Sequence, residues 1–575
     1  MLGRNKGQLS MKSLVTVAGH FVVALLVLVG CSRRAPIKPA TLGAAQRGTV
    51  TYRFPGPDHG PSPGSGGGTL RIASPWDPAT FDFHATSAAY VQFLGKLFFD
   101  YLTYIDEEGT PEPWLANSWD ISPDGLDYTF HLRDGVTFSD GTKFNADSVL
   151  ASLEHMRDPA TKSPLAGRYI ASYKSGEIID EHTFRAHLSQ PFSAFLEVLA
   201  QSWLPMYSAK AIRENPKGLA THPVGSGPFT LESFERQKGF TVVRRADYDW
   251  APPYIRHDGP AYFDRIEVDI VQEELVRLAA FTSGQYDLCL EVPPQLAANV
   301  LNNPNYLLYN QVRKGLPTRP IVFNVEKPPF DDIRVRRALA FATDQEAITQ
   351  LEGFGEYKTK SDYLSGNTRA YDASYKEVIH YDPAEANRLL DDAGWTDRDA
   401  QGYRTRSGQR LGAALLVSDA ASARAVTVAV QDNFKRVGFD LHYQAIPAAQ
   451  LTIRRRQGDY QAMAGGYWQT NTPDGLFIIH SSQEISTPTT FGQNSSRLRD
   501  AELDKLLLGA REATNHEEEL ALHSAAQKRL VELVPSIPLR ENHNLLAASR
   551  RLRGLLFETS HHAAFLTAAW LEKPR

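Results

Sequence analysis

Hydrophobic and polar positions in residues 69–575 follow two periodicities. Three segments alternate with the period of two that is typical of strands, at residues 69–73, 127–133 and 263–270. Elsewhere apolar residues recur at helical spacing, as they do after Asn145, which is a suitable N-cap. Because both patterns occur along the whole segment, we expect a mixed α/β fold.

Capping and turn residues mark the ends of further elements. Asp382 and Pro383 suit the start of a helix that Gly394 ends, and another helix is predicted over residues 272–282. Asp-Gly pairs supply the positive φ of tight turns, so residues 116–144 are predicted to form a turn-rich antiparallel region. The glycines of these pairs are Gly125, Gly135 and Gly141.

Three shorter features complete the predicted elements. Residues 286–290 and 459–464 are expected to be strands, and Cys289 in the first of them is expected to be a small buried hydrophobe. Gly225-Ser226-Gly227 is predicted to be a flexible turn.

The N-terminus differs from the rest of the chain. Residues 1–30 carry three basic groups and no acid, and residues 14–29 form an apolar run. This run is shorter than the roughly 20 residues that span a bilayer, so an export signal is favoured over a membrane anchor. The end of the run, Leu28-Val-Gly-Cys31, resembles the lipobox of bacterial lipoproteins, which implies cleavage before Cys31 and lipid attachment to its sulfur. The two acyl chains of such a group would give the stable anchoring that one chain does not.

The segment after the lipobox has the composition of a linker. Residues 32–68 contain six prolines and eight glycines and show no apolar periodicity, so we predict a flexible stalk. Residues 1–68 hold eight of the 61 basic and one of the 66 acidic residues, which leaves 53 basic against 65 acidic residues in the body. The net charge of −5 therefore averages a basic leader and an acidic body.

Composition excludes several classes of protein. With 42% hydrophobic and 22% charged residues, the chain is an ordinary soluble globular protein. Its charge balance does not suit a nucleic-acid binder, and two cysteines cannot form a disulfide framework.

Familiar catalytic motifs are missing from the sequence of the body. The chain has no His-Glu-x-x-His and no Walker loop, and its one Gly-x-Ser-x-Gly falls at residues 60–64 in the predicted stalk. Asp120 to Gly125 imitates the start of a calcium loop, but the twelfth position is His131 instead of Glu. We therefore expect no catalytic residues, no metal and no cofactor.

Six sequence blocks together resemble one family, the bacterial extracytoplasmic solute-binding proteins, family 5, which serve ABC importers of peptides, nickel and related solutes. The blocks span most of the body, in the order found in that family. They are Pro113-Trp-Leu-Ala-Asn-Ser-Trp119, residues 124–141, Val224-Gly-Ser-Gly-Pro-Phe229, residues 323–338, Ala393-Gly-Trp395 and Pro535-Ser-Ile-Pro-Leu539.

The resemblance implies an α/β periplasmic-binding-protein fold, a two-lobed flytrap with an extra subdomain. Lobe I is expected over residues 69–315, with the subdomain at about 106–224, and again over residues 535–575. Lobe II is expected over residues 316–534, so two hinge crossings flank a ligand cleft that closure buries.

The resemblance also implies which residues bind the ligand. On one wall these are Ser87, Ala88, Ala89 and Tyr90, after Asp82-Phe83-His84, and near the hinge they are Phe323 and Asn324. From the segment after residues 459–464 they are Tyr467, Trp468, Gln469, Asn471 and Asp474. Two alternatives stay open: Ser87 caps a helix whose first turn holds Ala88 and Ala89, and Trp468 is a core tryptophan.

Asn471 departs from the family pattern. Peptide-binding relatives carry an aspartate there that pairs with the α-ammonium of the peptide, and a neutral amide loses the charge-assisted part of that bond. This departure leaves the cargo open between free peptides and N-blocked, neutral or non-peptide solutes.

The expected function is a substrate-binding lipoprotein of an ABC importer. Its expected partners are a peptide or peptide-like solute, the permease subunits and, through the lipid, the outer face of the cell membrane or the periplasmic side of the envelope; we expect a monomer that binds no nucleic acid. The alternatives are a binding protein for an oligosaccharide, opine or nickel chelate, and an anchored hydrolase or sensor with the same fold.

Overall fold

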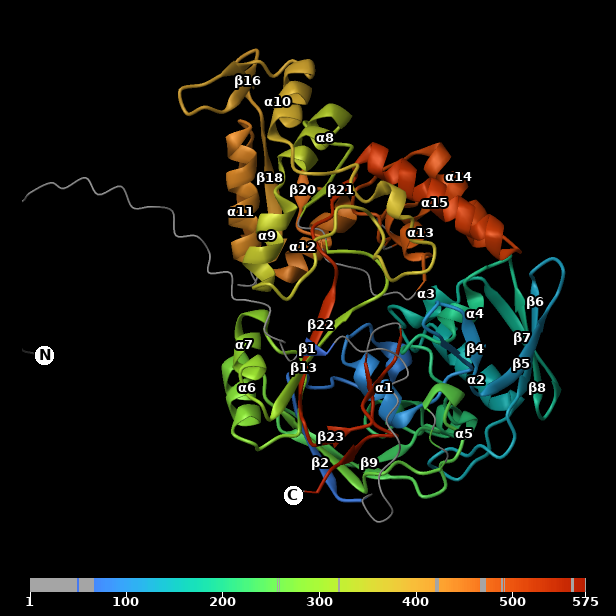
Figure 1. The fold of residues 1–575 in the computed structure, drawn as a ribbon. Helices are drawn as coiled ribbons and strands as arrows, with labels where there is room; N and C mark the ends of the chain where they lie inside the picture. The colour runs from blue at the N-terminus through green and yellow to red at the C-terminus, as the bar shows by residue number, and fades with distance from the viewer. Residues whose placement is uncertain are drawn as a thin grey trace, which may run out of the picture. The chain divides into compact units, whose positions relative to one another are not determined.

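The computed structural model describes most of the body of the chain (Figure 1). The described residues are 49–50, 67–255, 257, 259–318, 321–418, 423–465, 472–487, 490, 492–559 and 563–573. They belong to one unit, Gly48–Arg575. The predicted signal peptide at residues 1–30 and the lipid-attachment residue Cys31 lie outside the described residues.

An eight-stranded sheet forms the base of the predicted lobe I. Its parallel pairs are β2 with β11, β2 with β12 and β1 with β13, and its other pairs are antiparallel. In sheet order the strands are β1 (Thr49–Val50), β13 (Tyr306–Val312), β22 (His543–Ser549), β12 (Leu288–Cys289), β2 (Thr69–Ser74), β11 (Arg265–Ile270), β10 (Gly239–Arg244) and β9 (Phe229–Glu235). Helices α6 (Glu274–Thr282) and α7 (Ala297–Leu301) pack against β12 and β13, respectively.

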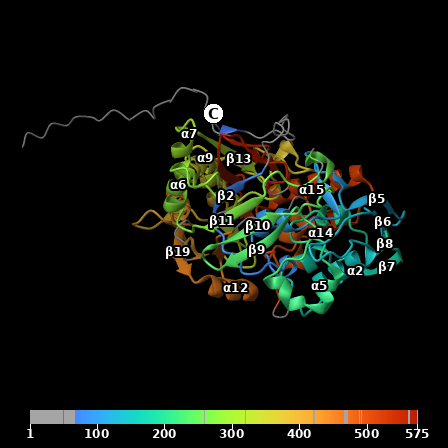
Figure 2. The ribbon, with the colours of Figure 1, turned by 90° about the horizontal axis from the view of Figure 1, so that it is seen from below.

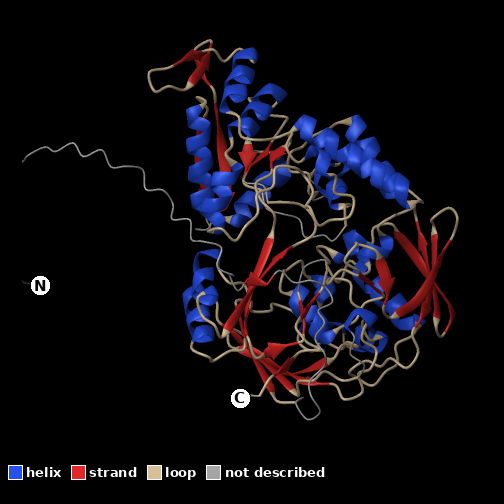
Figure 3. Ribbon diagram, in the orientation of Figure 1, coloured by secondary structure: helices blue, strands red, loops and turns tan. Residues whose placement is uncertain are grey.

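A five-stranded sheet forms the centre of the predicted lobe II. Its order is β19 (Asp440–Ile446), β18 (Gly412–Ser418), β20 (Ala462–Met463), β14 (Ile321–Phe323) and β21 (Ser536–Ile537). Figure 3 shows helices grouped around this sheet. They are α8 (Ile333–Ala342), α9 (Gln345–Gly353), α10 (Pro383–Asp392), α11 (Ala423–Arg436) and α12 (Ala448–Gln457).

The chain passes between the two sheets twice. It leaves the eight-stranded sheet after Val312 and enters the five-stranded sheet at Ile321, and it returns between Ile537 and His543. The eight-stranded sheet is therefore discontinuous in sequence, because β22 comes from the C-terminal part of the chain. Because β21 pairs with β14 in the five-stranded sheet, the chain returns to the eight-stranded sheet only after Ile537, slightly later than the predicted boundary at residue 535.

A separate antiparallel sheet lies within the predicted subdomain. Its order is β5 (Ala116–Ile121), β6 (Asp127–Leu132), β8 (Thr183–Leu188) and β7 (Tyr173–Asp180), and α2 (Ala146–Arg157) packs against β7 and β8. Figure 2 shows this group apart from the strands of the eight-stranded sheet. The three Asp-Gly glycines have φ values of +68°, +79° and +80°, which confirms the predicted turns.

Most of the predicted elements are confirmed. Asn145 forms a reciprocal capping box with Ser148 at the start of α2, and the Asp382 carboxylate accepts hydrogen bonds from two backbone N–H groups of α10. Gly394 follows α10 with φ +82°. Cys289 is buried in β12, as expected.

Two local predictions are wrong, and one open alternative is ruled out. Thr49 and Val50, inside the predicted flexible stalk, form the short strand β1, which pairs with β13; Thr and Val both favour strands. Ser87 is not a helix cap, since α1 (Val91–Phe98) begins later, after Tyr90. Gly225-Ser226-Gly227 is a site of close backbone packing and not a flexible turn: a Cβ added at Gly225 would lie 2.0 Å from the Phe98 carbonyl oxygen.

Candidate functional site

The predicted lobes meet along a seam at the edge away from the two crossings. On one side are α4 (Phe195–Val198) and the β5–β6 turn of the subdomain; on the other are a loop at Arg369, α14 (Ala501–Glu512) and α15 (His516–Leu533). Segments from both sides line a cavity of about 590 Å³, which we call the seam cavity. A cavity of this size is in the range of small-molecule sites.

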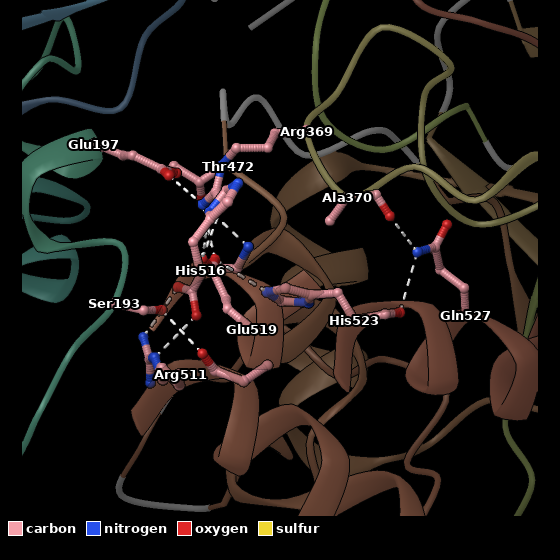
Figure 4. Close-up of polar contacts among 12 residues, drawn as sticks. Ser193, Glu197, Arg369, Ala370, Thr472, Arg511, His516, Glu519, His523 and Gln527 are labelled. Atoms are coloured by element: carbon pink, nitrogen blue, oxygen red, sulfur yellow. Dashed lines mark hydrogen bonds and ion pairs between the residues drawn. The ribbon is translucent and has the colours of Figure 1, made fainter. Parts of the chain in front are cut away.

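Arg369 is the central residue of the seam (Figure 4). Its two terminal nitrogens each donate to a different Glu519 oxygen at 2.7 Å, which forms a bidentate pair within lobe II. One of these nitrogens also donates to Glu197 on the lobe I side, and the other approaches His516 Nδ1 at 3.0 Å. The guanidinium therefore joins carboxylates of both lobes.

A second guanidinium lies next to this group. Arg511 forms a fork with Asp474, with Nε 2.9 Å from Oδ1 and Nη2 3.2 Å from Oδ2. The Arg511 guanidinium also lies over the ring of Phe477, 4.0 Å from its centroid. Asp474 is the residue before α13 (Gly475–His480), so this pair fixes the start of that helix against α14.

Three further contacts cross the seam. Ser193 donates its backbone N–H to the Arg511 carbonyl oxygen at 2.8 Å and its hydroxyl to the Ala510 carbonyl oxygen at 2.9 Å. Arg168 in the subdomain forms an ion pair with Glu484 of lobe II. Because these contacts join the two lobes directly, the structure represents a closed arrangement of the seam.

Burial dominates the ionisation of the seam residues. Burial raises the pKa of Glu197 to about 8. Arg369 lowers this pKa, and the negative charges of Glu519 and Asp474 raise it. Burial also raises the pKa of Asp474, against the opposing effect of Arg511. The pKa of His523, which lies behind Glu519, is lowered to about 4 by burial, so this imidazole is neutral at pH 7.

Comparison with known proteins identifies the family. Residues 110–484 match the family model described as bacterial extracellular solute-binding proteins, family 5, middle region. The chain belongs to this family. The family and the periplasmic-binding-protein fold predicted from the sequence are thereby confirmed.

Three known proteins are similar to this chain. Glutathione-binding protein GsiB of Escherichia coli O1:K1 / APEC is 29% identical over 481 residues, which cover 83% of this chain and 89% of GsiB. Heme-binding protein A of Haemophilus influenzae is 28% identical over 475 residues, 79% of this chain and 83% of that protein. The structure of the ABC transporter-associated periplasmic binding protein DppA from Helicobacter pylori, in complex with the peptide STSA, has a TM-score of 0.71 and 25% identity, with 88% of this chain and 99% of that chain covered.

In this family 5 protein, the predicted wall at residues 87–90 precedes α1. Ser87 is exposed, Ala88 and Ala89 are half-buried, and Tyr90 is buried with its hydroxyl donating to the Thr80 carbonyl oxygen at 3.0 Å. Ligand contact by these four residues stays a prediction.

Hydrogen bonds of buried polar side chains fix residues 82–84, the segment just before this predicted wall. The Asp82 carboxylate accepts from the His84 backbone N–H at 3.2 Å. His84 Nε2 lies 2.9 Å from the Pro205 carbonyl oxygen and Nδ1 lies 2.9 Å from His155 Nδ1. A neutral His84 ring therefore donates to Pro205 and accepts from His155, and burial lowers the pKa of His84 in agreement with this. One carboxylate oxygen of Asp82 and one ring nitrogen from each of His84 and His155, the atoms that could ligate a metal ion, lie within 4.8 Å of one another.

Phe323 and Asn324 both lie inside lobe II. The Phe323 ring packs on Phe330 with centroids 4.7 Å apart, and its side chain is fully buried. The Asn324 amide donates to the carbonyl oxygens of Gly458 and Tyr460 at 3.1 and 2.8 Å. Their contact with a ligand stays a prediction, and the observed contacts link β14 to the start of the β20 strand.

The remaining predicted residues are divided between the seam and the part of the chain that is not described. Asp474 lies in the seam and is paired with Arg511. Tyr467, Trp468, Gln469 and Asn471 lie outside the described residues. The expectation for Asn471 and the open alternative for Trp468 are therefore untested.

The main charged residues of the seam are not among those predicted from the sequence. Glu197 carries a usable signal, because it is the only charge in the apolar run Phe195-Leu-Glu-Val-Leu-Ala200, and a charge buried in such a run needs a partner. Arg369 and Glu519 carry no comparable signal. Their pairing depends on the folding of a loop onto a helix 150 residues away.

Proposed function

We propose that this protein is the solute-binding component of an ABC importer and captures a peptide or peptide-like solute between its two lobes. Family membership is the observation that carries this proposal. The two sheets joined by two crossings support it, because such a connection lets lobes rotate about a hinge and bury a ligand. The proposed lobes are residues 69–315 with 535–575, and residues 316–534.

The relatives favour a peptide-like cargo. GsiB is named for binding glutathione, and the DppA structure contains the peptide STSA. Heme-binding protein A shows that the family also includes a protein named for a different ligand. The acidic body and the charged seam suit polar cargo.

The position of the seam contacts supports closure of the two lobes about the crossings. The segments at 313–320 and 538–542 connect the sheets, while Arg369, Glu197 and Ser193 lie where the lobes touch at the other edge. Opening must break the hydrogen bond from Arg369 to Glu197 and both Ser193 hydrogen bonds. A bound solute supplies the free energy that favours the closed arrangement over the open one.

We propose further that the protein is a monomeric lipoprotein, exported by residues 1–30 and attached to the cell envelope through Cys31. The charge and apolar pattern of the N-terminus supports this location. In the part of the chain that the structure describes, no helix has the length and apolar character needed to cross a membrane. Expression of Cys31→Ser in a bacterium that processes lipoproteins should move the protein from the membrane to the soluble fraction; unchanged membrane association would refute the anchor.

A thermal-shift panel tests the binding function. Purified protein comprising residues 48–575, the compact unit of the structure, is screened against di- to pentapeptides, N-acetylated peptides, opines, oligosaccharides and nickel chelates. A ligand at about 100 times its Kd stabilises the folded state by about 2.7 kcal/mol, which gives a clear rise in melting temperature. The proposal predicts such a rise for at least one peptide or peptide-like compound. Stabilisation by non-peptide solutes alone would overturn the peptide assignment and leave solute binding in place.

A further inference from the structure

A cluster of possible metal ligands in lobe I consists of residues that take no part in the seam. Asp82, His84 and His155 are all buried, and one ligand atom from each lies within 4.8 Å of the other two. Asp82 caps the short helix η1 (Phe83–Ala85), which contains His84, and His155 belongs to α2. The sequence predicted no metal site, because the two histidines are 71 residues apart and form no motif. The cluster joins the segment before the predicted ligand wall to a helix of the subdomain.

His84 is oriented as a metal-ligating histidine. Its Nε2 lies 2.9 Å from the Pro205 carbonyl oxygen, and because a carbonyl oxygen only accepts, Nε2 carries the hydrogen. The Nδ1 lone pair therefore points into the cluster, toward His155 Nδ1 at 2.9 Å. Histidines that ligate metals typically donate their other N–H to a carbonyl or carboxylate group, which fixes the ring in this way.

No neutral form of His155 satisfies both of its neighbours. When Nδ1 carries the hydrogen, it donates to His84, and the lone pair of Nε2 then faces the Asp82 carboxylate, 3.7 Å from Oδ2. When Nε2 carries the hydrogen, two Nδ1 lone pairs face each other at 2.9 Å. A cation among the three side chains removes this conflict.

The buried Asp82 carboxylate also lacks a lysine or arginine partner among the described residues. Its one ion pair with a described residue is with His155. Burial raises the pKa of Asp82 and lowers the pKa of His155, which disfavours the ionised form of each. A divalent ion binds neutral imidazole and supplies the positive charge beside the carboxylate itself.

We propose that Asp82, His84 and His155 bind one divalent transition-metal ion, and that Zn²⁺ is the ion best suited to them. Imidazole nitrogen and carboxylate oxygen ligate zinc in proteins at about 2.0 to 2.2 Å, so two ligands of a tetrahedral ion lie about 3.4 Å apart. The observed separations, 2.9 Å between the two Nδ1 atoms and at most 4.8 Å within the set, bracket this value. Three protein ligands leave the fourth position to solvent, which the side chains of Asp82 and His155 reach, with 10% and 7% of their area exposed.

The ion would tie the predicted ligand wall to the subdomain. Because the wall predicted at residues 87–90 begins shortly after His84, an ion on Asp82 and His84 would fix its N-terminal end against α2. Zinc would be a resident ion of lobe I and not the cargo, and it would stabilise the folded protein whatever solute is bound between the lobes.

Zinc titration of the protein comprising residues 48–575, purified without a polyhistidine tag and freed of metal with EDTA, tests the proposal. Isothermal titration of wild-type protein at about pH 7.5 should give one Zn²⁺ per chain, and Zn²⁺ should raise the melting temperature. Asp82→Asn and His155→Gln should each weaken binding at least tenfold and lose that rise. His131→Gln is the matched control, since His131 forms an imidazole–carboxylate pair with Asp120, 2.9 Å apart, on the surface, and this variant should stay within twofold of wild type.

Two further measurements keep the test decisive. Circular dichroism shows which variants are folded, and Asp82→Asn, which replaces one oxygen by an amide nitrogen, is expected to stay folded. Co²⁺ titration reports on coordination directly, because the d–d absorption of a nitrogen- and oxygen-ligated ion should appear in wild type and be absent from both variants.

The outcomes separate the metal site from the proposed function. Folded wild-type protein that binds no Zn²⁺, or folded Asp82→Asn that binds it as wild type does, would overturn the site. Loss of binding in His131→Gln would place the ion on the surface pair and contradict the assignment. Stabilisation of metal-free protein by a peptide-like solute would leave the proposed function in place in each case.

Discussion

At the residue scale, His543 is a buried group whose protonation opposes folding. Its Nε2 accepts the Lys358 backbone N–H at 3.0 Å, and its Nδ1 lies 2.6 Å from the Asn310 amide oxygen. The ring is therefore neutral, and burial, with smaller effects of Arg540 and Lys358, lowers its pKa to about 3. This residue lies at the second crossing, where lobe I meets a loop of lobe II.

Acid should destabilise the protein through this histidine. In the unfolded chain this histidine has a pKa of about 6.5 and binds a proton below that pH, whereas in the folded protein the ring stays neutral. The stability contributed by the neutral ring is therefore fully present above pH 6.5, and the free energy of unfolding falls as the pH decreases below it. Between pH 7 and 5 the loss from this residue is about 2 kcal/mol. In urea unfolding at both pH values, His543→Gln should lose about that much less than wild type, and His222→Gln, a change at an exposed histidine, should behave as wild type. Equal acid sensitivity of His543→Gln and wild type would contradict the assignment.

The partners that individual polar side chains contact could not be predicted from the sequence. Asp82 and His84 were recognised as part of a family segment, but their buried contacts with His155 and Pro205 depend on segments 70 to 120 residues away. Asn324 was predicted near a ligand, and the structure shows its amide donating to two backbone carbonyl oxygens. A polar side chain in a sequence block does not reveal whether its partner is a ligand or the chain itself.

At the element scale, local sequence determined most boundaries. The Asn145 cap of α2, the Asp382-Pro383 start of α10 and the Asp-Gly turns all act within a few residues, so they could be predicted. Strand β1 could not, because the prolines and glycines around it gave the whole segment the composition of a linker, while its partner β13 is more than 250 residues away. Gly225 and Gly227 were misjudged for the same reason, since the backbone of Phe98 that they contact is distant in sequence.

At the scale of the whole molecule, we propose two lobes that close on a solute, and contacts of Arg369, Glu197 and Ser193 join them at the seam. This architecture could be expected from the sequence because the six blocks resemble a family whose members have a two-lobed fold, and the family match and the two sheets agree with it. The seam chemistry was not predictable, since it arises from three segments that meet only on folding: residues 193–197, the loop at Arg369, and α14 with α15.

Native mass spectrometry of protein purified from its own host, without denaturation, tests the central claim most directly. The claim predicts a 1:1 adduct of a peptide or peptide-like solute, released when the protein is unfolded and restored by adding the identified compound back. Protein that carries no adduct, and that no candidate solute stabilises in the thermal-shift panel, would contradict the account of a solute receptor.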